Sequence, residues 1–201
     1  MRGPRGVKRL GRMNRNSRPI RETQQLRKGR ISIPGARYFM TCCCVRPCDA
    51  LSSPDTAQAL LHVWSRLEAN GDIELLAATV MPDHVHLLYR LVGCLSPGQI
   101  SGKMKALSKP TLSASDMEWQ RDFWEHRLRP DEAANPYALY IFMNPYRAGL
   151  IGRTQTWPYW YHNPSVDFDF LHMLDGGLYP PEVWMDCEIE AYGLLRDHVG
   201  E

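Results

Sequence analysis

The chain has 201 residues, of which 44% are hydrophobic, so it can bury the core of one domain with appendages, or of two small domains at most. No apolar run is long enough to span a bilayer, and no signal peptide with a basic start and an apolar stretch is visible. The composition therefore argues against a membrane protein and predicts a soluble, cytoplasmic one.

Charge is distributed unevenly along the chain. Residues 1–30 hold eleven Lys and Arg and one acid, a net charge of +10, whereas the remainder carries −8. This Gly- and Arg-rich segment cannot bury enough apolar surface to offset the entropy lost on ordering, so we expect a disordered basic arm. Such an arm either tethers the protein to nucleic acid or is a solvated leader, and the sequence leaves both options open.

Strands and helices alternate after the arm. Residues 37–45 (RYFMTCCCV) are rich in aromatic and β-compatible residues and predict a strand. Residues 55–71 carry an apolar stripe at helical spacing and predict a helix that stops at Gly71. Residues 73–81 predict a second strand, and a Pro-Asp turn leads to a third strand over residues 84–91.

The second half of the folded region continues this alternation. Residues 96–109 predict a helix capped by Ser96, residues 123–129 a short strand, and residues 131–144 a helix with acids at its start. From residue 152 onward Gly, Pro and aromatic residues dominate, and no element is predicted. This order predicts an α+β fold: a ferredoxin-like split βαβ sheet with helices on one face plus a C-terminal helix. Such a fold serves many functions, so function must be argued from a site.

The cysteines do not have the spacing of a zinc site. Cys42, Cys43 and Cys44 alternate between the faces of a strand and cannot converge on one ion, and the sequence contains no Cys-x-x-Cys pair. We expect reduced, partly buried thiols.

Two histidines interrupt the third predicted strand, VMPDHVHLLYRL (80–91). Residues i and i+2 of a strand share a face, so His84 and His86 point one way while apolar residues point the other. The two imidazoles are within reach of one metal ion. One histidine hydrogen-bonded in the interior and one solvated is the alternative for such a pair.

The last predicted helix supplies further polar groups. Tyr140 and Asn144 are four residues apart and share a helix face. If this face is turned toward the third strand, His84, His86 and Asn144 can bind one divalent cation beside Tyr140, whose hydroxyl can attack a polarised phosphodiester. Alternatively, Tyr140 is a core aromatic. Tyr137 and Tyr146 compete as nucleophiles, but Tyr137 has no polar partner one turn on, and Tyr146 follows the Asn-Pro break.

Three motifs, MPDHVHLL, WQRDFWEHRLR and YIFMNPYRAGL, resemble in this order those of the REP-associated tyrosine transposases. These belong to the single-tyrosine HUH (His, hydrophobic, His) transposases, which are IS200-like. The resemblance covers roughly residues 37–160 and implies a transposase domain over residues 31–160. The basic arm (1–30) precedes it, and a tail of unknown role (161–201) follows.

The resemblance also implies the chemistry of the site. Tyr140 matches the catalytic nucleophile, His84 and His86 match the metal-binding pair, and Asn144 lies where the family completes the metal site. The implied reaction is cleavage and rejoining of structured single-stranded DNA through a 5′-phosphotyrosine and a free 3′-OH. The implied cofactor is a divalent metal, Mg²⁺ or Mn²⁺, and histidine ligands favour Mn²⁺.

The implied partner is single-stranded or hairpin DNA, with no membrane contact; a homodimer is left open. Candidate DNA contacts are basic residues and possible stacking surfaces around the second motif: Arg121, Arg127, Arg129, Trp119 and Trp124. Their alternative role is a solvated strand edge with core aromatics.

Two other functions remain to be tested. A domesticated protein would bind structured DNA or RNA without cleaving it. A metal-dependent hydrolase would use His84 and His86 with a water nucleophile and would form no covalent DNA adduct. Two segments also depart from the family pattern, Tyr146 in the third motif and WPYWYHN (157–163).

Overall fold

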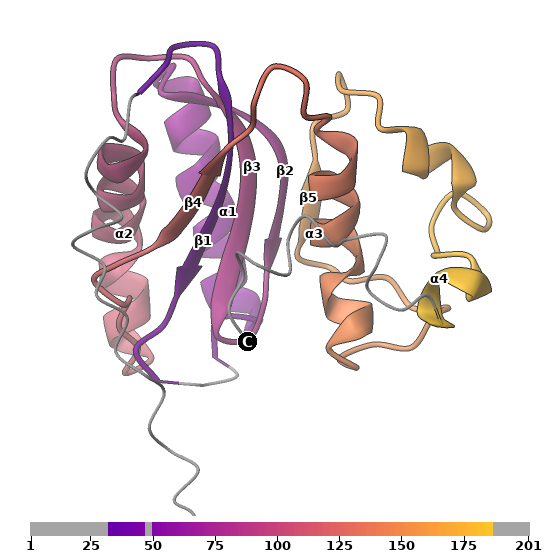
Figure 1. Cartoon of the computed structure of the whole chain (residues 1–201). Coiled ribbons are helices and arrows are strands. Elements are labelled where there is room, and N and C mark those ends of the chain that lie inside the picture. Colours follow the sequence, from indigo (N-terminus) through magenta and orange to yellow (C-terminus); the bar gives the residue numbers. More distant parts are fainter. Residues whose placement is uncertain (1–31, 47–49, 187–201) are drawn as a thin grey trace, which may run out of the picture. The chain divides into compact units, whose positions relative to one another are not determined.

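The computed structural model describes residues 32–46 and 50–186, so the predicted arm of residues 1–30 lies outside the described residues. The described residues form ten elements in chain order, and Figure 1 labels the strands and α-helices among them. The elements are β1 Arg37–Cys43, α1 Pro54–Ala69, β2 Ile73–Val80, β3 His84–Leu91, α2 Pro97–Ala114, β4 Trp124–Arg127, α3 Asn135–Arg147, β5 Trp160–His162, the 3₁₀ helix η2 Asp169–Met173 and α4 Glu182–Asp186. All seven predicted elements are present.

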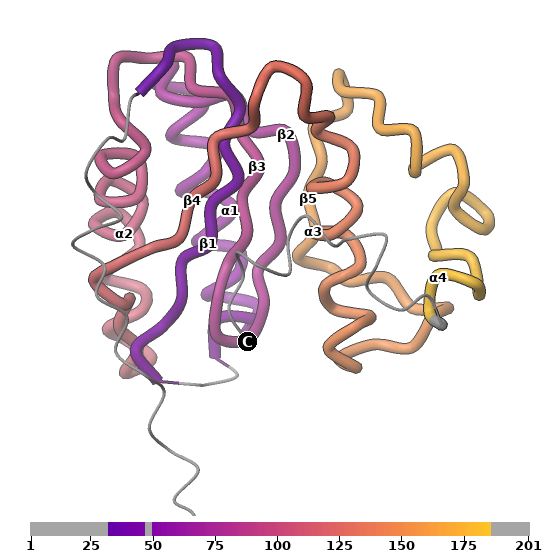
Figure 2. The backbone as a smooth tube through the Cα atoms, in the orientation of Figure 1, coloured from indigo at the N-terminus to yellow at the C-terminus, as the bar shows by residue number. Residues whose placement is uncertain are grey.

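The strands form one antiparallel sheet in the order β4-β1-β3-β2-β5. Both β1 and β2 pair with β3, which lies between them and runs the opposite way, so the connection through α1 is a split βαβ crossover that can be followed in Figure 2. The predicted α+β, ferredoxin-like fold is confirmed. Strand β5, which pairs with the outer edge of β2, was not predicted.

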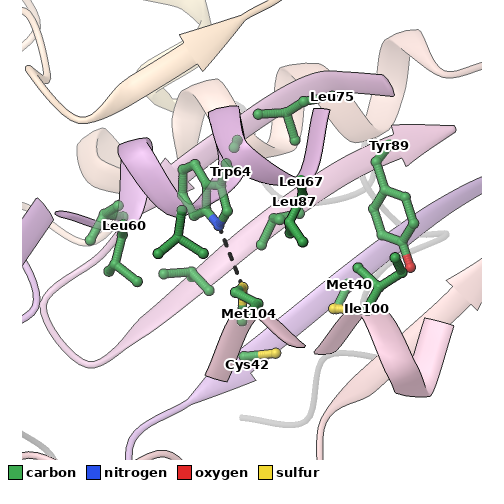
Figure 3. Packing of buried hydrophobic residues seen from close by; sticks show 14 of the residues in the cluster. Met40, Cys42, Leu60, Trp64, Leu67, Leu75, Leu87, Tyr89, Ile100 and Met104 are labelled. Carbon is green, nitrogen blue, oxygen red and sulfur yellow. Dashed lines mark hydrogen bonds between the residues drawn. The ribbon is translucent and has the colours of Figure 1, made fainter. Parts of the chain in front are cut away.

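Helices α1 and α2 cover one face of the sheet, as the ribbons in Figure 1 show. Side chains that alternate along the strands, such as Met40 and Leu87, meet the predicted apolar stripe of α1 there. Trp64 of α1 donates its indole N–H to the sulfur of Met104 on α2, at 3.4 Å (Figure 3). Ser96 caps α2 as predicted, within a capping box with Gln99.

Helix α3 covers the opposite face and builds a second core. Phe39 of β1 is completely buried there, and Phe142 of α3 packs against Trp160 of β5 and Phe170 of η2, with ring centroids 5.5 Å apart in each pair. The segment around β5 and η2, in which no element was predicted, therefore completes the packing around α3.

Strand β2 contains a bulge that exchanges its faces. The pairing with β3 shifts between Leu75 and Ala77, so Leu76 is the additional residue. Leu75 and Ala78 lie in the core under α1 and α2, whereas Leu76 and Ala77 lie in the core under α3. The bulge thereby turns Thr79 toward the α3 face.

Two predicted helix boundaries differ from the structure, in both cases at a proline. Helix α2 was predicted to end at residue 109 but continues past Pro110, because Leu112 in its last turn is buried. Helix α3 was predicted over residues 131–144, but it starts at Asn135 and continues through Pro145 to Arg147. Pro145 is buried, and packing offsets the backbone hydrogen bond that a proline cannot donate.

None of the described helices is long and apolar enough to cross a membrane. The four cysteines in the described ranges, Cys42, Cys43, Cys44 and Cys94, form no disulfide bond there.

Candidate active site

A row of side chains crosses the sheet on the α3 face, and His86 is at its centre. The strand pairing places Thr41 of β1 on one side of His86 and Thr79 of β2 on the other. Trp124 continues the row on β4 and Trp160 on β5. His86 is fully buried in this row.

The two histidines meet through their Nε2 atoms. The Nε2 atoms of His84 and His86 are 3.1 Å apart. Each ring also makes a hydrogen bond through its other nitrogen, Nδ1. Nδ1 of His84 lies 2.7 Å from a carboxylate oxygen of Asp83, and Nδ1 of His86 lies 2.8 Å from the hydroxyl of Thr41. Both rings therefore direct Nε2 toward the same point.

Helix α3 brings Tyr140 and Asn144 to this point. The amide nitrogen of Asn144 lies 3.1 Å from His86 Nε2, and the rings of His86 and Tyr140 contact edge to face at a centroid distance of 5.3 Å. Arg147, two turns after Tyr140 on the same helix, holds its guanidinium 5.5 Å from the centre of the Tyr140 ring. The structure thus brings together the four residues that the sequence singled out: His84, His86, Tyr140 and Asn144.

Burial shifts the ionisation of both central groups. It lowers the pKa of His86 well below the ordinary value, and the neighbouring His84 adds to this effect, so His86 is neutral at physiological pH. Burial also raises the pKa of Tyr140, while the positive charge of Arg147 and a hydrogen bond with Asn144 act in the opposite direction. A neutral imidazole is the form that binds a metal, whereas the phenol must lose its proton to act as a nucleophile.

The donor set fits a divalent metal with open positions. In the described parts of the chain, no three His, Cys, Asp or Glu side chains are arranged so that they could hold one metal ion. The candidate set is therefore two imidazoles and one amide, whose oxygen a rotation of the Asn144 side chain would present. Two nitrogen ligands ~2.1 Å from one ion and at right angles are separated by ~3.0 Å, close to the 3.1 Å between His84 and His86 Nε2. Three protein donors leave room for substrate oxygens.

Tyr137, the competing nucleophile, lies in the core. Its ring stacks on His126 at a centroid distance of 5.7 Å and it is only 2% exposed. Burial raises the pKa of Tyr137 to about 12. The adjacent face of α3 thus positions Tyr140, and not Tyr137, beside the histidines.

The candidate DNA contacts divide between the two faces of the sheet. Trp124 lies on the α3 face in the row of His86, whereas Arg127 alternates to the opposite face. Trp119 is 8% exposed, lies in the core under α2 and donates its indole N–H to Ser108. Trp119 and Arg121 also line a cavity of 710 Å³ beside α2. Arg129 is exposed beyond the end of β4.

Three residues of the site had no role in the sequence analysis. Asp83 directly precedes His84, so the motif itself offered this signal. Arg147 follows Tyr140 by seven residues, but the predicted break at Pro145 removed it from the helix. Thr41 is 45 residues from His86, and only the register of β1 against β3 brings them together.

Comparisons with known proteins agree with the predicted motifs. Residues 37–130 match the family model described as transposase IS200 like. The chain is 26% identical over 104 residues to the REP-associated tyrosine transposase of Escherichia coli (strain K12), a match that covers 51% of this chain and 62% of the relative. It is 29% identical over 100 residues to a Haemophilus influenzae protein named as a putative REP-associated tyrosine transposase, covering 43% of this chain and 57% of that relative.

The fold comparison agrees as well. A solved structure described as a REP-associated tyrosine transposase bound to a REP hairpin superimposes with a TM-score of 0.57 at 24% sequence identity, covering 79% of this chain and 88% of that one. The alignments span about three fifths of the length of the curated relatives. Motifs, family model and relatives together confirm that this chain resembles the REP-associated tyrosine transposases of the IS200-like group.

Proposed function

We propose that this protein is a transposase that cleaves and rejoins structured single-stranded DNA, with Tyr140 as the nucleophile. The observation that carries the proposal is the convergence of Tyr140 and Asn144, from α3, on the paired Nε2 atoms of His84 and His86, from β3. A phenol beside a candidate metal site is the arrangement that tyrosine-mediated phosphoryl transfer requires.

His84, His86 and Asn144 would hold the divalent metal, with Mn²⁺ favoured by the imidazoles. When bound, the ion supplies Lewis-acid polarisation of the scissile phosphate. Burial keeps His86 neutral and available as a ligand, and Asn144 adds an uncharged oxygen donor. The protein residues themselves orient the reacting groups and exclude water from one side.

Tyr140 then performs the strand transfer. Its oxygen attacks the phosphorus and forms the P–O bond of a 5′-phosphotyrosine, while the bond between phosphorus and the 3′ oxygen breaks and the leaving oxygen takes up a proton as the 3′-OH. The phenol proton leaves to solvent, and Arg147 stabilises the phenolate. The phosphotyrosine retains the energy of the ester, so attack by a 3′-OH rejoins strands without a nucleotide cofactor.

Hairpin DNA is the proposed partner. One structurally similar transposase was solved with a REP hairpin, and this chain carries a surface that suits unpaired bases. Trp124 lies in the row of His86 on the α3 face and offers an aromatic ring beside the scissile position. Arg121, which is exposed and lines the cavity beside α2, provides a second candidate contact, whereas Trp119 in the same cavity is buried.

The decisive experiment looks for a covalent adduct. The full chain is incubated with Mn²⁺ and a 5′- or 3′-labelled single strand that carries a hairpin, and the products are separated under denaturing conditions. We expect a labelled adduct from the 3′-labelled strand only, because a 5′-phosphotyrosine leaves the protein on the fragment 3′ of the break. No adduct should form with Tyr140→Phe or in the presence of a chelator. Tyr137→Phe is the matched control on the same helix and should retain the adduct.

The alternatives give different products. A non-cleaving binder would shift the hairpin in a native gel but leave the strand intact with both metal and wild-type protein. A hydrolase with a water nucleophile would cut the strand without an adduct, and Tyr140→Phe would still cut. Either result contradicts the proposed nucleophile.

A further inference from the structure

We propose that Asp83 and Thr41 are positioning residues that fix the ring orientation of His84 and His86 through Nδ1, so that both Nε2 atoms face a single cation, and that Asp83 also fixes the tautomer of His84. This inference rests on the proposed metal site and adds two residues to it. Neither residue reaches the point where the Nε2 atoms meet, so each acts through its histidine.

Asp83 determines the proton position on His84. An ionised carboxylate can only accept a hydrogen bond, so the 2.7 Å contact requires that His84 Nδ1 carries the proton. Neutral His84 then has its lone pair on Nε2. The Asp83 side chain is 40% exposed, so solvent screens its charge and we expect a moderate effect on ligand strength.

Thr41 holds the ring of His86 with a neutral hydroxyl, which can donate or accept and therefore fixes the ring orientation but not the tautomer. As oriented in the structure, the Asn144 amide N–H₂ donates to His86 Nε2 at 3.1 Å, so Nε2 is an acceptor and the proton of His86 lies on Nδ1. Nδ1 donates it to the Thr41 hydroxyl at 2.8 Å. Both groups are buried, so no water can replace Thr41 easily, and we expect its loss to have the larger effect.

The consequence is a pair of Nε2 atoms 3.1 Å apart, and in the metal-free arrangement that of His86 accepts the Asn144 N–H. If Asn144 rotates to present its oxygen, a cation can use both Nε2 lone pairs. The Nδ1 contacts keep either ring from turning away, so the site is organised for a cation before DNA arrives. Hydrogen bonds behind metal-ligating histidines contribute in general ~10- to 100-fold to metal affinity.

The chain contains a matched control for Thr41. Thr79 flanks His86 on the other side of the same row and is also fully buried, but its hydroxyl has no hydrogen-bond partner among the residues that the structure describes. Thr41→Val and Thr79→Val make the same isosteric change on the two strands that flank His86. They differ only in that the Thr41 hydroxyl contacts His86 Nδ1.

The test measures Mn²⁺ binding to the full chain without DNA, by the loss of the free Mn²⁺ electron paramagnetic resonance signal. We expect Thr41→Val to weaken binding ~10-fold or more and Asp83→Ala by somewhat less. Thr41→Ser should restore most of the affinity, and Thr79→Val should bind as the wild type. Melting temperatures identify any variant that fails to fold. If Thr41→Val does not fold, the Mn²⁺ affinities of Thr41→Ser and Thr79→Val are still compared with that of the wild type.

A second measurement reports the tautomers directly. Long-range ¹H–¹⁵N correlation spectra of the metal-free protein should show the proton on Nδ1 of both histidines, and Asp83→Ala should give His84 a mixture of tautomers. The inference is overturned if the wild type, Thr41→Val and Asp83→Ala bind Mn²⁺ with equal affinity and His84→Ala abolishes binding. If His84→Ala also binds Mn²⁺ normally, the proposed metal site itself is wrong.

Discussion

We expect Arg147 to favour ionisation of the Tyr140 phenol, and Arg147→Gln tests this expectation quantitatively. The guanidinium lies over the Tyr140 ring at the end of α3 and favours the phenolate, opposing the effect of burial on the pKa of Tyr140. Removing this charge therefore raises the pKa of Tyr140 further. Below that pKa, the fraction of phenolate falls by the same factor, so the cleavage rate at a given pH should fall.

The size of the effect follows from the 5.5 Å between the guanidinium and the ring centre. Two unit charges at this separation interact by ~0.8 kcal/mol in the dielectric of water and by ~3 kcal/mol at an effective constant of 20. Arg147 is exposed, so the value near water applies, and we take about 1 kcal/mol. That corresponds to a roughly fivefold smaller fraction of phenolate and a roughly fivefold slower reaction at neutral pH.

The assay is single-turnover adduct formation at saturating DNA, which removes any contribution of Arg147 to DNA binding. Arg147→Lys preserves the charge and should retain most of the rate. Arg66→Gln makes the same charge change on α1, on the other face of the sheet, and should have no effect. The difference between Arg147→Gln and wild type should also shrink as salt is raised, because the interaction is partly screened.

Two results would refute this reasoning. One is an Arg147→Gln protein that reacts as fast as wild type at pH 7 and low salt. The other is a slower variant whose Tyr140 pKa, followed by ¹³C resonance of the labelled ring, is unchanged, since Arg147 would then act on the phosphate or on the fold and not on the phenol.

Three further predictions concern stability and binding. Phe39 contacts both His86 and Tyr140. Phe39→Leu should lower the free energy of unfolding in urea by about 1–2 kcal/mol and slow adduct formation. An unchanged free energy of unfolding would mean that the site does not depend on this packing. The folded state keeps His86 neutral, whereas the unfolded chain protonates it near pH 6.5. Without metal, the free energy of unfolding should therefore be highest above pH 6.5 and should fall below it by up to about 1.4 kcal/mol per pH unit. His86→Gln should flatten this dependence, and an equally steep curve for this variant would contradict the prediction. Deleting residues 1–30, which carry a net charge of +10, should weaken hairpin binding and reduce the slope of log K against log salt by ~0.7 for each lost phosphate contact, while equal slopes would indicate a passive leader.

The sequence by itself determined the order of the elements and singled out the four residues that meet in the candidate site. Alternation over residues 84–91 is strong because one face of β3 is entirely apolar, and this assigns His84 and His86 to the other face without knowledge of any partner strand. The spacing of Tyr140 and Asn144 likewise requires only the helical period. Local patterns of this kind survive folding because burial of one face dictates them.

Only the tertiary structure decided what surrounds these residues. Thr41 meets His86 through a strand register that no local pattern encodes, and the bulge at Leu76 turns Thr79 to the same face. Pro145 predicts a helix end from local propensity, yet packing of the buried last turn carries α3 on to Arg147 and so places a cation over Tyr140. Long-range packing free energy exceeds local preference at these positions, and therefore the residues that tune the site are the ones that sequence patterns did not reveal.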